Sequence, residues 1–158
     1  MKKKLDKIAK DTNFYLKRFL NKSSNSELVL AMKYGLFPGG KKIRSKILVD
    51  IGSLLSINKK TLIMIGAAVE CIHAYSLIHD DLPCMDNDKM RRGKPSTHIK
   101  FGESTAVLAG NSLLTMAFEI LTNDKLNVSE ITKVSLIKKL SECAGHLGIA
   151  GGQYLDLS

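Results

Sequence analysis

The sequence is poor in the residues that define several protein classes: of its 158 residues none is tryptophan, three are proline and three are cysteine. Cys71, Cys84 and Cys143 are odd in number and show no CxxC spacing, which argues against a disulfide framework and a zinc site. The longest nearly uncharged apolar run, 62–69, is far shorter than the ~20 residues needed to cross a bilayer. The lysine-rich start is not followed by the apolar segment of a signal peptide. We therefore expect a cytoplasmic protein without stable membrane insertion.

Acidic residues are also scarce: the sequence has 15 Asp and Glu but 24 Lys and Arg, which gives a formal net charge of +9. This balance favours anionic partners such as phosphates, nucleic acid or lipid headgroups, and charge alone does not choose among them. Only four basic residues are arginines, and three of them, Arg44, Arg91 and Arg92, lie beside glycine turns. Since arginine holds phosphate through a planar fork that lysine lacks, we interpret these three as anion-binding residues.

The pattern of apolar residues predicts an all-α fold in one domain, 1–158. Apolar side chains recur at helical spacing over 5–20, 26–35, 41–57, 61–80, 103–122 and 128–157, the last interrupted at its glycines. No alternating strand pattern is present. Residues 82–103, with two prolines and two glycines, predict a long active-site loop holding at most a short helix. In the third helix the predicted apolar face is Ile43, Ile47, Leu48, Ile51, Leu54 and Leu55.

An acidic cluster carries the clearest chemistry. Residues 79–88, HDDLPCMDND, place four carboxylates at the C-terminal end of a predicted helix, where the helix dipole disfavours negative charge. Mg²⁺ takes hard oxygen ligands and typically binds through one or two carboxylates plus substrate phosphates. Just downstream, Arg91 and Arg92 offer forked donors for diphosphate oxygens. The cluster and the arginine pair together predict a diphosphate site.

A second anion site is predicted at 38–44, PGGKKIR. Its glycines permit close backbone approach, and a helix N-terminus presents free N–H groups. Lys41 and Arg44 are three residues apart and share one side. His73 lies two helical turns before Asp80 on the same face; alone it would be interpreted as a core histidine. Beside two anion sites, we interpret it as a binding residue.

These motifs together resemble those of the trans-isoprenyl diphosphate synthases: GGKKIR at 39–44, ECIH at 70–73, DDLPCMD at 80–86 and RRG at 91–93. The resemblance extends from about residue 36 through FGESTA at 101–106 and GGQYLDL at 151–157. It implies the N-terminal part of the isoprenoid synthase helical bundle. The six-residue step from Asp80 to Asp86 resembles bacterial-type farnesyl diphosphate synthases and some geranylgeranyl synthases.

The resemblance also implies roles at the acidic cluster. Asp80 and Asp86 would bind Mg²⁺ bridging an allylic diphosphate, with Asp81 beside them as a ligand or supporting partner. Arg91 would hold the same diphosphate. Departure of that diphosphate would leave an allylic cation, which the alkene of isopentenyl diphosphate attacks before a proton is lost.

The remaining implied roles concern the second substrate and product length. Gln153 belongs to a motif lining the same cavity. Tyr75 and Ser76 would floor an apolar tunnel, with the bulky Tyr75 favouring a short product. The diphosphate of isopentenyl diphosphate would be bound by Lys41, Arg44, His73 and Arg92.

Members of this family are longer and carry a second aspartate-rich motif, which nothing here matches. The sequence is therefore expected to be the N-terminal half of a synthase. Because a half-bundle leaves apolar helix faces uncovered, we expect a homodimer, domain swapping or reliance on a second fragment.

The preferred hypothesis is condensation of isopentenyl diphosphate with dimethylallyl or geranyl diphosphate to farnesyl diphosphate, with Mg²⁺ and without a nucleic-acid partner. A geranylgeranyl or longer-chain synthase and a non-catalytic subunit of a full-length partner stay open. A terpene cyclase binds one diphosphate, so the second anion site argues against it. A basic helical module on nucleic acid or a membrane would show steep salt dependence and need no Mg²⁺.

Overall fold

The computed structural model describes residues 2–21, 25–37 and 40–158, which are helical apart from loops and one short hairpin. The hairpin pairs β1 with β2, antiparallel, Met90 opposite Pro95 and Arg91 opposite Lys94. The elements in chain order are α1 (Lys2–Leu20), α2 (Glu27–Leu36), α3 (Ile43–Leu54), α4 (Lys59–Asp80), β1 (Met90–Arg91), β2 (Lys94–Pro95), α5 (Thr97–Phe101), α6 (Glu103–Thr122), α7 (Glu130–Ala144) and α8 (Ile149–Asp156). The all-α prediction is confirmed.

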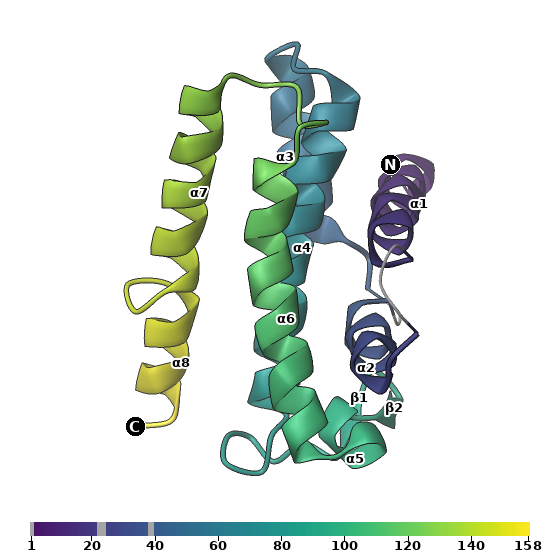
Figure 1. The fold of residues 1–158 in the computed structure, drawn as a ribbon, viewed down its shortest axis with the longest axis vertical. Coiled ribbons are helices and arrows are strands. Elements are labelled where there is room, and N and C mark those ends of the chain that lie inside the picture. Colours follow the sequence, from purple (N-terminus) through teal and green to yellow (C-terminus); the bar gives the residue numbers. More distant parts are fainter. Residues whose placement is uncertain (1, 22–24, 38–39) are drawn as a thin grey trace.

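Helix α4 forms the centre of the bundle (Figure 1). It packs most extensively against α6 and α3, and also against α1 and α2. Buried alanines on both partners, Ala67 and Ala68 on α4 with Ala109 and Ala117 on α6, let the two helices approach closely. Helices α4 and α6 are long and apolar enough to span a membrane, but 67% of the α4 stretch is buried inside the protein. The apolar composition of α4 is therefore explained by its place in the core.

Helix α3 differs from its prediction in both length and orientation. It ends at Leu54 rather than near Asn58, and Asn58 instead caps α4 by accepting a hydrogen bond from the Lys60 N–H. The predicted apolar face is mostly uncovered. The small residues of α3 face α4, since only they allow its backbone to come so near. Its buried residues are Ser45, Val49 and Gly52, whereas Ile43, Ile47, Ile51, Leu54 and Leu55 are exposed.

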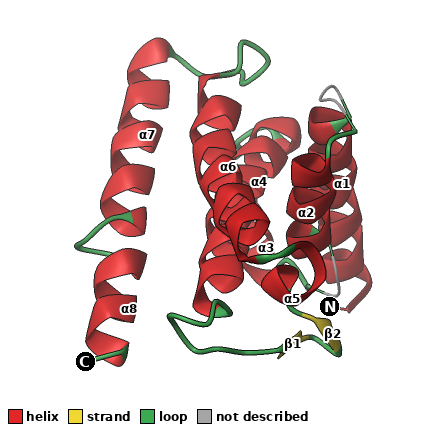
Figure 2. Ribbon diagram, turned by 60° about the horizontal axis from the view of Figure 1, so that its bottom comes forward, coloured by secondary structure: helices red, strands yellow, loops and turns green. Residues whose placement is uncertain are grey.

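The loop over 82–103 is more structured than the sequence suggested. It contains the β1–β2 hairpin and the five-residue helix α5 (Figure 2). The strands were missed because two residues each are too few to show an alternating pattern. The predicted interruption of the last helix is confirmed, since α7 ends at Ala144 and α8 begins at Ile149. Residues 22–24, and Pro38 and Gly39 of the predicted anion site at 38–44, which we call the basic turn, lie outside the described residues.

The contact of α3 with α4 predicts the effect of adding one methyl group. A Cβ on Gly66 would lie 3.0–3.2 Å from Ser45, including its Cα, so the α3 backbone would have to move. Overpacking costs about 1–3 kcal/mol, whereas alanine gains only about 1 kcal/mol of helix propensity over glycine. Gly66→Ala should therefore lower the free energy of unfolding in urea. The control is Gly152→Ala on α8, where a Cβ meets nothing within 4 Å and stability should not fall.

Candidate functional site

A cleft of about 320 Å³ lies where the end of α2, the start of α3, the C-terminal half of α4 and the hairpin meet. Four residues from three separate parts of the sequence line it: Lys41 and Arg44 from the basic turn, His73 from α4, and Arg92 from the hairpin. They are the four that the family resemblance assigned to a single diphosphate. The fold thus brings together one predicted anion site from positions up to 51 residues apart.

The basic turn is held in place from the protein interior by a buried lysine. Lys42 is the N-cap of α3 with φ 48° and ψ 46°, left-handed values that are unusual for a lysine. Its Nζ donates a hydrogen bond to the Leu36 carbonyl at 2.9 Å and lies 3.7 Å from Glu70 Oε2. Because Lys42 turns inward, Lys41 and Arg44 remain exposed in the cleft.

The hairpin separates its two adjacent arginines. Arg91 Nε donates to Asp81 Oδ1 at 2.8 Å, and its Nη2 contacts Asp81 and Asp88. Arg92, at φ 54°, points instead into the cleft, where a Cβ on Gly40 would lie 3.0 Å from its Nη1. Glycine at 40 therefore leaves room for the guanidinium, and the two arginines serve two neighbouring sites.

The hairpin itself is anchored by contacts that the sequence did not reveal. Tyr34 donates its hydroxyl hydrogen to the Pro95 carbonyl at 2.7 Å, and Lys100 Nζ lies 4.2 Å from the centroid of the Tyr34 ring. The Ser96 N–H donates to the Lys89 carbonyl at 2.9 Å. No local pattern marks Tyr34 for this role, because its partners lie about sixty residues away in the chain.

The acidic cluster lies where α4 ends. The Asp86 N–H donates to the Asp80 carbonyl at 2.9 Å, which folds the loop back over the helix end. Burial, and then the carboxylate of Asp86, raises the pKa of Asp80. Crowded oxygen donors of this kind suit Mg²⁺. Asp81 is buried, and its carboxylate is paired with Arg91.

The cluster does not by itself provide a complete ligand set. Over residues 2–21, 25–37 and 40–158, no group of three or more His, Cys, Asp or Glu side chains is placed to hold a metal ion. Asp80 and Asp86 nevertheless fit Mg²⁺, because this ion is usually bound by one or two carboxylates together with water and substrate phosphates. The residues present therefore suit a metal that arrives with a diphosphate.

An apolar cavity of about 350 Å³ adjoins the basic cleft, and the two share Arg44 and His73 in their walls. Its other lining residues come mostly from α4 and α7 and include Ile72 and Ala144. Tyr75 is buried, donates to the Ala144 carbonyl at 3.4 Å and lies edge-on against His79. A polar cleft that shares wall residues with an apolar cavity suits a ligand with a charged head and a hydrocarbon chain.

The other two predicted site residues, Ser76 and Gln153, are not among the described lining residues of the cleft or of the apolar cavity. Ser76 donates its hydroxyl hydrogen to the His73 carbonyl at 3.1 Å, within its own helix. Gln153 is on α8, outside the described lining of the cleft, so the structure does not bring it to the diphosphate residues.

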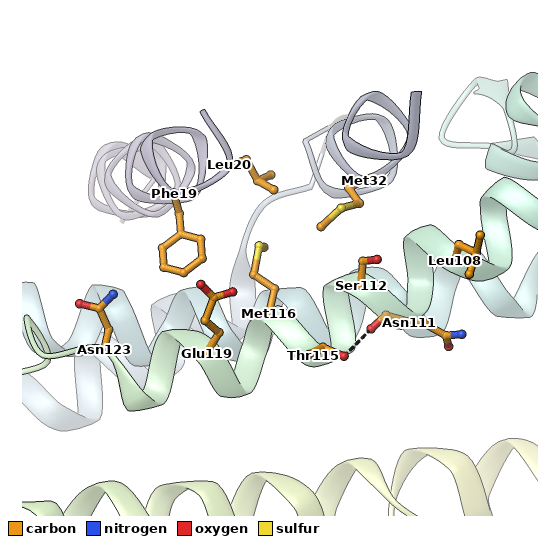
Figure 3. Close-up of a pocket in the computed structure, with 10 residues that line it drawn as sticks. All are labelled: Phe19, Leu20, Met32, Leu108, Asn111, Ser112, Thr115, Met116, Glu119 and Asn123. Atoms are coloured by element: carbon orange, nitrogen blue, oxygen red, sulfur yellow. Dashed lines mark hydrogen bonds between the residues drawn. The ribbon is translucent and has the colours of Figure 1, made fainter. Parts of the chain in front are cut away.

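A larger cavity of about 600 Å³ between α1, α2 and α6 contains none of the predicted site residues. Figure 3 shows Phe19, Met32 and Met116 pointing toward the space between these helices. Of its described lining residues only Glu119 is charged, so the cavity lacks the cations that a diphosphate needs. This cavity is therefore not suited to bind a diphosphate.

The lowered pKa of His73, in the wall of the cleft, predicts that the stability of the protein depends on pH. Burial, and then the positive charge of Arg44, lowers the pKa of His73 from 6.5 to about 4. Between these values the unfolded chain binds a proton that the folded chain does not, so the free energy of unfolding should fall as pH drops from 6.5 toward 4. Urea unfolding across this window should show a smaller fall for His73→Gln. Equal slopes for both proteins would contradict the assignment.

Comparison with known proteins gives consistent matches. A family model described as polyprenyl synthetase matches residues 25–158. The farnesyl diphosphate synthase of Buchnera aphidicola subsp. Acyrthosiphon pisum (strain APS) is 50% identical over 133 residues, 84% of this chain and 47% of that protein. The farnesyl diphosphate synthase of Escherichia coli (strain K12) is 46% identical over 156 residues, 97% of this chain and 52% of that protein. The chain thus spans about half the length of these relatives.

A solved structure supports the same relationship. The geranyltransferase of Legionella pneumophila superposes with a TM-score of 0.93 at 39% identity, over 98% of this chain and 55% of that one. The fold, the ordered motifs and the family match therefore agree: the chain belongs to the polyprenyl synthetase family.

Proposed function

We propose that the protein to which this chain belongs condenses isopentenyl diphosphate with an allylic diphosphate to give farnesyl diphosphate. The observation that carries the proposal is the position of the basic cleft beside the acidic cluster, with adjacent arginines turned one to each. The relatives named above, at 46–50% identity, are farnesyl diphosphate synthases. Because those proteins are about twice as long, the activity is proposed for the whole protein.

In this proposal the basic cleft binds isopentenyl diphosphate. Arg44 and Arg92 hold diphosphate oxygens through their planar forks, and Lys41 adds a point charge. His73, with a pKa of about 4, is neutral at neutral pH and contributes a hydrogen bond rather than a charge. Fixing the head group in this way keeps the alkene beside the carbon that it attacks.

The acidic cluster is proposed to hold the allylic diphosphate. Asp80 and Asp86 would hold Mg²⁺, which when bound neutralises charge on a leaving diphosphate. Arg91, aimed by buried Asp81, would hold the same diphosphate from the hairpin side. The allylic C–O bond breaks and releases diphosphate, a new C–C bond forms to the alkene of isopentenyl diphosphate, and the released diphosphate takes up the proton that the resulting cation loses. The polar side chains stabilise charge, and none is required as a nucleophile.

The proposed activity is tested with radiolabelled isopentenyl diphosphate and geranyl diphosphate, with Mg²⁺ or with a chelator. Mg²⁺-dependent farnesyl product is expected from the whole protein, and Asp80→Asn should lower the rate about 100-fold or more because charge stabilisation is lost. Asp124→Asn, an exposed change beyond α6, is the matched control. Product formation that survives Asp80→Asn or chelation would contradict the proposed role of the acidic cluster.

Tyr75 is proposed, with Ser76, to limit product length. Its hydroxyl bonds to the carbonyl of Ala144, a residue that lines the apolar cavity, although Tyr75 is not itself among the described lining residues. Tyr75→Ala should therefore shift the products toward longer chains, as chromatography of the dephosphorylated prenols would show. Phe14→Ala, which removes an exposed aromatic ring on α1, is the control. An unchanged product distribution for Tyr75→Ala would remove this role.

A further part of the proposal is a cytoplasmic homodimer, and the uncovered apolar side chains support only its association with further protein. Exposed apolar residues gather on α3 and on α7 with α8, where solvent contact is unfavourable. Sedimentation should show a species larger than the monomer. A monomer at every concentration would contradict the prediction.

A further inference from the structure

We propose that Glu70 is a positioning residue, which with Lys42 sets the basic turn in the geometry that binds diphosphate. This inference rests on the proposed function of the cleft. Glu70 stands at the start of the ECIH motif, in which the sequence assigned a role only to His73. It touches no predicted site residue through a described hydrogen bond, and its contacts are to the backbone and the lysine that hold the turn.

The charge of Glu70 makes its location informative. Its side chain is 4% exposed and lies in the wall of a cleft whose other charged lining residues, Lys41, Lys42, Arg44 and Arg92, are all cations. A buried carboxylate beside an anion site repels the ligand and costs desolvation energy. A direct role in binding a diphosphate therefore does not explain it, whereas a role in holding the neighbouring backbone does.

Each oxygen of Glu70 has a partner in the turn. Oε1 accepts a hydrogen bond from the Ser45 N–H at 3.1 Å, in the first turn of α3. Oε2 lies 3.7 Å from Lys42 Nζ, which also donates to the Leu36 carbonyl at the end of α2. Ser45 Oγ donates to the Gly66 carbonyl at 3.0 Å, one turn before Glu70. One carboxylate thus ties together α2, the turn and the start of α3.

Lys42 would not hold this position without the carboxylate. It is buried, adopts a left-handed backbone conformation and lies near Arg92. Burial lowers the pKa of Lys42, and Glu70 opposes that change. If Lys42 moved out toward solvent, the two residues on either side of it would rotate with the backbone. Those residues include Lys41, and Arg44 follows in the first turn of α3.

The test uses Glu70→Gln in the whole protein, with isopentenyl diphosphate binding measured by calorimetry in Mg²⁺-free buffer. Glutamine keeps an acceptor for Ser45 but loses the charge that holds Lys42. If Glu70 only repelled the diphosphate, removing its charge would tighten isopentenyl diphosphate binding. If Glu70 instead positions the basic turn, its replacement should weaken isopentenyl diphosphate binding about tenfold, the scale of losing a hydrogen bond to a charged group. The two explanations therefore predict opposite signs. Glu119→Gln on α6 is the control for removing one negative charge elsewhere, and it should leave affinity unchanged.

A double variant guards against failure to fold. Glu70→Gln with Lys42→Met leaves the net charge of the cleft unchanged, and neutral replacement of a buried ion pair is often tolerated. Weaker isopentenyl diphosphate binding is again expected, because the link to Leu36 is lost. A second readout is Mg²⁺-dependent binding of geranyl diphosphate at the acidic cluster. A displaced basic turn should leave geranyl diphosphate binding intact, whereas a general structural defect would weaken the binding of both diphosphates.

The outcomes separate this inference from the proposed function. Unchanged or tighter isopentenyl diphosphate binding by Glu70→Gln, or a parallel loss of geranyl diphosphate binding, would overturn the inference alone. Absence of isopentenyl diphosphate binding by the unaltered protein would overturn the proposed function of the cleft, and this inference with it.

Discussion

The junction of α3 with α4 is the constraint on which the candidate site depends. Ser45 lies against Gly66 and bonds to both its carbonyl and Glu70, so the N-terminus of α3 is fixed to the middle of the central helix. This contact requires small residues on the facing sides of α3 and α4. It also explains why the larger apolar residues of α3 turn away from the core. The contact of Ser45 with Gly66 and Glu70 also fixes the position of the basic turn, because the turn leads directly into α3.

The hairpin supplies the second half of the arrangement. Its tight reversal sends Arg91 to buried Asp81 and Arg92 to Gly40, so one short element connects the acidic cluster with the basic cleft. Reaction of two diphosphate substrates requires both head groups to be held at a fixed separation. A rigid connection between the two sites, anchored by Tyr34, meets that requirement more directly than a mobile loop.

Much of this could be predicted from the sequence, because helical periodicity and ordered motifs are local signals. The nearly uniform apolar character of α4 correctly indicated the central helix. Residue types and spacing placed Lys41 and Arg44 at one anion site, with His73 as a binding residue. Arg92, which residue type had grouped with Arg91 at the acidic cluster, was assigned to this cleft only by the family resemblance. The orientation of α3 could not be predicted, since its stripe of isoleucines is the usual mark of a buried face. The roles of Glu70 and Tyr34 depend on partners distant in sequence, for which spacing gives no signal.

The most direct test of the central claim is a crystal structure of the protein with isopentenyl diphosphate and without Mg²⁺. The account predicts the diphosphate among Lys41, Arg44, His73 and Arg92, with the Glu70–Lys42 pair intact beneath it and the hydrocarbon directed toward the apolar cavity. A diphosphate bound only at the acidic cluster, or in the cavity between α1, α2 and α6, would contradict it.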